Sequence, residues 1–139
     1  MRRFMVTSAV LAWTFGAALL FVPADFLAPM GITVTPAIAV SAQAQGAILI
    51  GLGAINFGAR AMTADTAGPI LFGNLIVQAL SLLVIGRALV TRAVPVQNAP
   101  AVLVHVLLGA GFLYHIMQRS GTRGRRAKNA GQAKRDVAR

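Results

Sequence analysis

The chain has 139 residues and a formal net charge of +10, and 57 % of its residues are apolar whereas only 12 % are charged. A soluble domain has about 25 % charged residues, so this composition excludes a soluble globular protein and indicates a bilayer as the solvent. The chain has no cysteine, which excludes disulfides, thiolate catalysis and cysteine-held metal clusters. Eight of the thirteen basic residues lie after Met117, so the high charge belongs to the C-terminal segment.

The first apolar run covers residues 4–22, follows Arg2 and Arg3, and ends at Pro23. As a helix it would span roughly 28 Å, which is close to the thickness of the bilayer core. A secretory signal peptide has only about 7–15 residues in its apolar region. We therefore expect an uncleaved membrane helix, and a signal peptide cleaved near Val22-Pro23-Ala24 is the alternative.

Three further spans are predicted. The second covers residues 37–61 and follows a connection rich in proline, glycine and apolar residues, which fits a turn in the membrane interface. The third covers residues 69–89 and begins at Pro69, where Asp65 can cap the helix start. The fourth covers residues 100–117. The predicted fold class is all-α: an integral membrane four-helix bundle with up-down topology, formed by residues 1–117.

Residues 118–139 differ in kind, because they are rich in Arg, Lys, Gly, Ala and Gln and cannot bury a core. We expect a disordered basic tail, and a helix over residues 126–138 that lies on a surface is the alternative for part of it. With four spans both termini share one side, which holds eleven basic residues against two on the other side, so the positive-inside rule predicts that both termini are cytoplasmic.

The basic tail lies next to a membrane helix, where anionic lipid attracts each basic residue by about 1 kcal/mol. The candidate lipid contacts are Arg119, Arg123, Arg125, Arg126 and Lys128. No aromatic residue is interleaved among them to stack on bases, so we expect no nucleic-acid partner.

Polar side chains inside the spans are the candidate ligand-binding residues: Gln45, Asn56, Asn74, Gln78 and His105. Gln45 and Asn56 share one helix face, and Asn74, Gln78 and Ser81 form a stripe on the third span. Interhelical hydrogen bonds between such groups contribute on the order of 0.6–2 kcal/mol each. We favour two stripes that face each other and fix helix register; a polar cavity for a small ligand is the alternative.

His105 is a candidate functional group because an ionisable residue within a membrane span is rare. A neutral histidine bonded to Asn74 or Gln78 would satisfy the same position.

Small residues form a further pattern. Ala42 and Gly46 are spaced i, i+4, as are Ala54 and Gly58, so helices can approach closely within the bundle or between two copies.

Several chemistries are excluded by missing residues. Proton-coupled exporters need a membrane carboxylate, but Asp25, Asp65 and Asp136 all lie outside the middle of the spans. Zinc and di-iron sites need clustered His and carboxylate ligands, and the sequence has neither these nor a catalytic triad, a P-loop or a dinucleotide fingerprint. We therefore expect no cofactor and no metal, and a non-enzymatic protein.

Several short stretches resemble small bacterial four-helix membrane proteins of the DoxX-like group, from the first span to the end of the third. They are Phe21-x-Pro23, then Phe26-Leu27 and Gly31-Ile32, and Gly46-Ala47 through Ala59-Arg60. The resemblance implies a four-helix bundle in a bacterial inner membrane and transfers no catalytic residue.

The sequence leaves three hypotheses open. The first is an inner-membrane protein that acts through helix–helix contacts with itself or with a partner complex. The second is binding or transport of a small apolar or quinone-like molecule between the second, third and fourth spans. The third is a membrane redox subunit with His105 near a cofactor. The second hypothesis needs Asn56 and Gln78 to line a space with room for a ligand.

Overall fold

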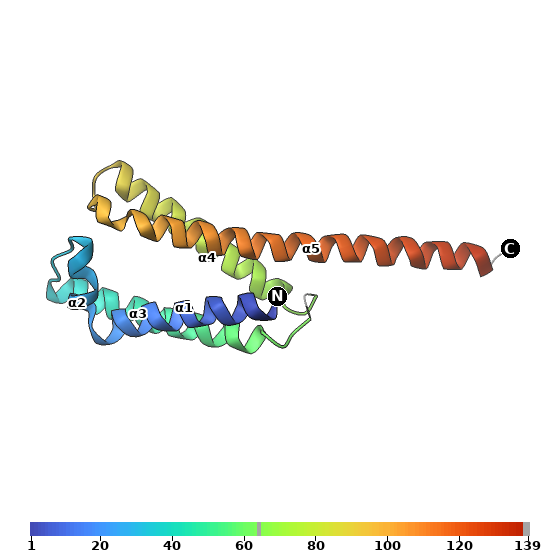
Figure 1. Cartoon of the computed structure of the whole chain (residues 1–139), viewed down its shortest axis with the longest axis horizontal. Helices are drawn as coiled ribbons and strands as arrows, with labels where there is room; N and C mark the ends of the chain where they lie inside the picture. Colours follow the sequence, from blue (N-terminus) through green and yellow to red (C-terminus); the bar gives the residue numbers. More distant parts are fainter. Residues whose placement is uncertain (64, 138–139) are drawn as a thin grey trace.

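The computed structural model describes residues 1–63 and 65–137, with side chains up to Arg119. This part of the chain contains α-helices and short 3-10 helices and no strand. Successive long helices run in opposite directions (Figure 1). The elements are α1 (Arg2–Phe21), α2 (Pro23–Leu27), η1 (Ala28–Met30), α3 (Pro36–Ala59), α4 (Gly68–Val90), η2 (Val96–Asn98) and α5 (Ala99–Val137).

Four of these segments are long and apolar enough to cross a membrane. They are Arg2–Phe21, Pro36–Ala59, Gly68–Val90 and Val96–Arg119, with 20 to 24 residues each. A helix of 20 residues spans about 30 Å. The all-α class and the four long apolar helices are therefore confirmed, and they are compatible with a multi-pass membrane protein.

Helices α1 and α3 form a tightly packed antiparallel pair, because glycines bring the two backbones into contact. A Cβ atom added at Gly46 would lie 2.6 Å from the carbonyl oxygen of Gly16 and 2.7 Å from the backbone nitrogen of Leu20. One at Gly53 would overlap the indole of Trp13, whose Nε1 donates to the carbonyl oxygen of Ile50 at 3.2 Å. Gly46 and Gly53 thus serve contact within the molecule.

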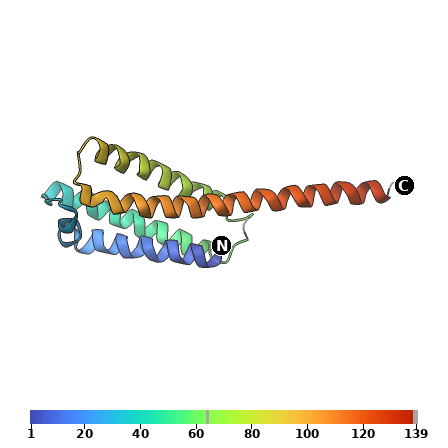
Figure 2. The ribbon, with the colours of Figure 1, turned by 45° about the horizontal axis from the view of Figure 1, so that its top comes forward.

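Helices α4 and α5 form the second pair, and Figure 2 shows the two pairs lying alongside each other. At the end that carries the N-terminus, an apolar cluster joins the pairs. Its rings Phe4 and Phe112 meet edge to face with centroids 4.8 Å apart. At the opposite end, the Nδ2 atom of Asn98 donates to the carbonyl oxygen of Met30 at 3.1 Å. The fully buried members of the cluster are Met5, Ala59, Ala67, Leu71 and Phe112.

The connection between the first two spans is more ordered than a simple turn. Pro23 opens α2, where its fixed φ and missing N–H suit the first helical position. η1 follows directly and ends at Gly31, which has a φ of 73° and so takes a left-handed conformation that glycine adopts without strain. Short helices therefore form the first part of this connection, residues 23–30.

The predicted disorder of the C-terminal tail is wrong for the backbone up to Val137. α5 continues without a break from Ala99 to Val137, a length of 39 residues. The physical reason lies in the same composition that argued against a core. Ala, Arg, Lys and Gln are good helix formers, and no proline follows Pro100 to stop the helix.

Candidate functional site: buried amides and an apolar groove

The amides of Asn56 on α3 and Asn74 on α4 pair directly. Nδ2 of Asn56 donates to Oδ1 of Asn74 at 3.0 Å, and Nδ2 of Asn74 donates to Oδ1 of Asn56 at 2.8 Å. Asn74 also donates to the carbonyl oxygen of Ile70 at 2.9 Å. The two side chains are 1 % and 3 % exposed. The predicted meeting of the two polar stripes is confirmed at this point.

Gln78 on α4 pairs with His105 on α5. Nδ1 of His105 lies 2.7 Å from Oε1 of Gln78. Because an amide oxygen only accepts, His105 donates through Nδ1–H. Gly109 lies one turn further along α5 and leaves room for the Gln78 side chain. A Cβ atom added at Gly109 would lie 3.4 Å from the Cβ atom of Gln78. The prediction that a glutamine or asparagine of the third span satisfies His105 is confirmed for Gln78.

Gln45 behaves differently from the other four candidates. It lies on the Asn56 face of α3, eleven residues earlier, yet its side chain is exposed. Within residues 1–63 and 65–119, its amide has no hydrogen-bond partner. The neighbouring Gln43 does have one, because its Nε2 donates to the carbonyl oxygen of Leu20 at 3.3 Å. The two stripes therefore meet at Asn56 but not at Gln45, because α4 covers α3 at Asn56 and leaves Gln45 exposed.

A groove of about 420 Å³ lies where α1 ends and α3 begins. Gln45 is the only ligand-binding candidate from the sequence that lines it. Asn56, Asn74, Gln78 and His105 instead direct their polar atoms at one another, which favours the register role of these four residues over a ligand cavity among them. The groove is lined by Leu19, Leu27, Ala37, Ile38, Ser41, Ala42 and Gln45.

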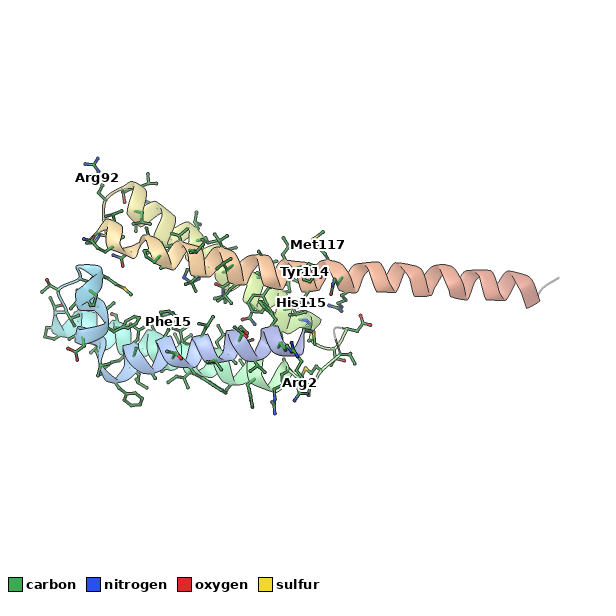
Figure 3. The ribbon with its side chains drawn as sticks, viewed as in Figure 1. Arg2, Phe15, Arg92, Tyr114, His115 and Met117 are labelled. Atoms are coloured by element: carbon green, nitrogen blue, oxygen red, sulfur yellow. The ribbon has the colours of Figure 1, made fainter. Side chains whose placement is uncertain are left out.

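Basic side chains gather at the end that carries the N-terminus, where Figure 3 places Arg2, whereas it places Arg92 at the opposite end. Nε of Arg119 lies 3.2 Å from Oδ1 of Asp65, so the start of the basic segment is tied to the α3–α4 turn. The guanidinium of Arg60 stacks 3.6 Å from the Phe57 ring centre. Of the five candidate lipid contacts, only Arg119 falls among the described side chains; Arg123, Arg125, Arg126 and Lys128 lie outside them.

Ionisable groups do not gather into a catalytic or metal-binding cluster in the described part of the chain, where no three His, Asp or Glu side chains lie together. His115 packs in the aromatic cluster, with its ring centre 5.1 Å from that of Phe4. Figure 3 shows it beside Tyr114 on α5.

Two hydrogen bonds that hold the helices in place are not predicted from the sequence. Asn98 lies between the third and fourth predicted spans, and its amide joins η2 to η1. Trp13 was counted only as part of an apolar run, but its indole N–H bonds to α3. An indole N–H in hydrocarbon needs an acceptor, so that requirement was the available signal for Trp13.

Comparison of the sequence with protein-family models, with curated proteins and with solved structures finds no match.

Proposed function

We propose that this protein is a multi-pass protein of a bacterial inner membrane that acts without catalysis, through helix–helix contacts with a second copy of itself. The proposal includes membership of the DoxX-like group, which rests on the short stretches named above. The observation that carries it is the outer face of α3, formed by the exposed residues Ala47, Gly51, Ala54 and Gly58.

These four residues follow the spacing i, i+4, i+7, i+11 and so share one helix face. A Cβ atom added at Gly51 or Gly58 would meet no described atom within 4 Å. Glycine in a helix interior costs roughly 1 kcal/mol relative to alanine, and lipid gains nothing from its small size. A second helix does gain, because small residues let two backbones approach closely in a membrane. The α1–α3 contact uses glycines in this way on another side of the same helix.

The distribution of charge supports an orientation with both termini in the cytoplasm. Arg60 ends α3 on the same side as the N-terminus and the basic segment, whereas Arg87 and Arg92 lie at the other side. The basic segment would then face the anionic cytoplasmic leaflet, where Arg119 and the basic residues after it contact lipid headgroups.

The experiment is native mass spectrometry of the full chain in mild detergent, over a range of protein concentrations. Gly51→Leu combined with Gly58→Leu fills the outer face, and we expect at least a tenfold loss of dimer, equivalent to about 1.4 kcal/mol. Gly73→Leu on α4 is the matched control, because Gly73 also has open space around it, and it should leave the dimer unchanged. A wild-type protein that stays monomeric throughout would contradict the proposal.

A further inference from the structure

We propose that the groove between α1, α2 and α3 binds an uncharged apolar molecule that carries one hydroxyl or carbonyl group, and that the Gln45 amide forms the hydrogen bond to that group. The inference does not depend on self-association, because Gln45 lies on a different side of α3 from Gly51 and Gly58.

The shape of the groove suits a small apolar molecule. Its volume of about 420 Å³ falls within the roughly 300–1,000 Å³ of small-molecule sites. Leu19 of α1, Leu27 of α2 and Ile38 of α3 supply apolar walls from three elements. Ala37 lies in the first turn of α3, and Gln45 lies about 12 Å deeper along the helix. The groove therefore runs from the helix ends towards the middle of the span.

The Gln45 amide supplies the specific contact. Ser41, the other polar lining residue, donates to the carbonyl oxygen of Ala37 at 3.0 Å, and the amides of Gln43, Asn56, Asn74 and Gln78 are also paired. Gln45 alone among these lacks a partner within the described residues. At this depth water is absent and an unpaired amide is costly, so a ligand that completes its hydrogen bonding gains affinity.

Charge at the groove selects against anions. Between Arg3 and Arg60 the only ionisable side chain is Asp25, which lies on α2 two residues from the lining residue Leu27. None of the residues that line the groove is charged, and the nearby carboxylate of Asp25 repels a carboxylate or phosphate. A phospholipid chain has no polar group at the depth of Gln45. An alcohol or ketone with a medium-length chain carries no charge and can place its polar group at the depth of Gln45.

The test uses the full chain in neutral phosphatidylcholine nanodiscs, labelled with a decanol that carries a diazirine near its tail. Mass spectrometry should place the label on Leu19, Leu27 or Ile38. Unlabelled 1-decanol and 2-decanone should each compete roughly tenfold better than decane, since one hydrogen bond is worth about that factor. Both should also compete better than decanoate, because decanoate is negatively charged. Equal competition by decanol and decane would overturn the proposal.

Two variants assign the effect to Gln45. Gln45→Leu should abolish the preference for decanol over decane while leaving the helical circular dichroism unchanged, because the side chain is exposed. Gln43→Leu is the matched control, since Gln43 lies two residues away and does not line the groove. It should keep the preference, and a preference that survives Gln45→Leu would refute the role of that amide.

Discussion

The two helix pairs of this protein are held together in opposite ways. α1 and α3 contact each other through Gly16, Gly46 and Gly53, where missing side chains allow the backbones to touch. α4 and α5 contact each other across the Gln78–His105 hydrogen bond. In a bilayer the hydrophobic effect does not drive helices together, because lipid tails are as apolar as the helix surfaces. Close packing and interhelical hydrogen bonds are then the forces that hold helices against each other.

The two helix–helix contacts differ in which substitutions destabilise them. The glycine contact depends on empty volume, so any added atom damages it and no partner substitution can compensate. The polar contacts depend on matched groups, as does the Asn56–Asn74 pair that joins α3 to α4. Removing one partner leaves the other without a hydrogen bond, whereas replacing both by apolar side chains leaves no unsatisfied polar group.

The largest effect is expected at the glycine contact. Gly46→Ala places a Cβ atom against the Gly16 backbone, which cannot yield as a flexible side chain would. We expect a loss of about 3 kcal/mol in the free energy of unfolding, measured by SDS titration in mixed micelles with circular dichroism. Gly73→Ala on α4 is the control, because a Cβ atom added at Gly73 meets no described atom, and it should stabilise by roughly 0.5–1 kcal/mol. Equal losses at the two glycines would show that the contact between the α1 and α3 backbones is not what makes Gly46 sensitive.

A smaller effect is expected at the asparagine pair. Asn56→Leu leaves the buried Asn74 amide without its main partner, and we expect a loss of about 1–3 kcal/mol in unfolding free energy. The double variant Asn56→Leu, Asn74→Leu should recover part of this loss. The measurement is a double-mutant cycle in the same micelles. Strictly additive single and double losses would show that the two amides do not interact.

The smallest effect is expected at His105. His105→Leu removes one hydrogen bond from Gln78, and we expect a loss of about 0.6 kcal/mol and at most about 1.7 kcal/mol. The ring is only partly buried, which limits the cost. Gly109→Ala tests packing at the same contact, and the 3.4 Å separation predicts a nearly neutral result. A loss at His105 larger than that at Asn56 would reverse the order proposed here.

Much of the architecture could be predicted from the sequence, because the four spans are continuous apolar runs bounded by proline, glycine or charge. The pairing of the polar stripes was also accessible, since an amide in hydrocarbon requires a partner and Asn56 and Asn74 supply one another. The small-residue spacing of α3 likewise predicts Gly46 as a contact residue, and this is confirmed by its approach to Gly16.

The remaining features depend on which neighbour covers which part of a helix, and periodicity cannot show this. Gln45 and Asn56 share a face, but α4 covers only the second of them. Ala54 and Gly58 follow the same small-residue spacing as Ala42 and Gly46, yet they point away from the other helices. The tail composition argued correctly against a core but does not distinguish a coil from an isolated helix.

The unbroken course of α5 has a mechanical consequence. From Arg119, where the ion pair with Asp65 holds the helix against the α3–α4 turn, eighteen more residues continue to Val137, a length of about 27 Å. A tilt of roughly 5° about Arg119 displaces the far end by about 2 Å along that length. A small rearrangement at the Gln78–His105 contact would therefore become a larger displacement at the far end of α5.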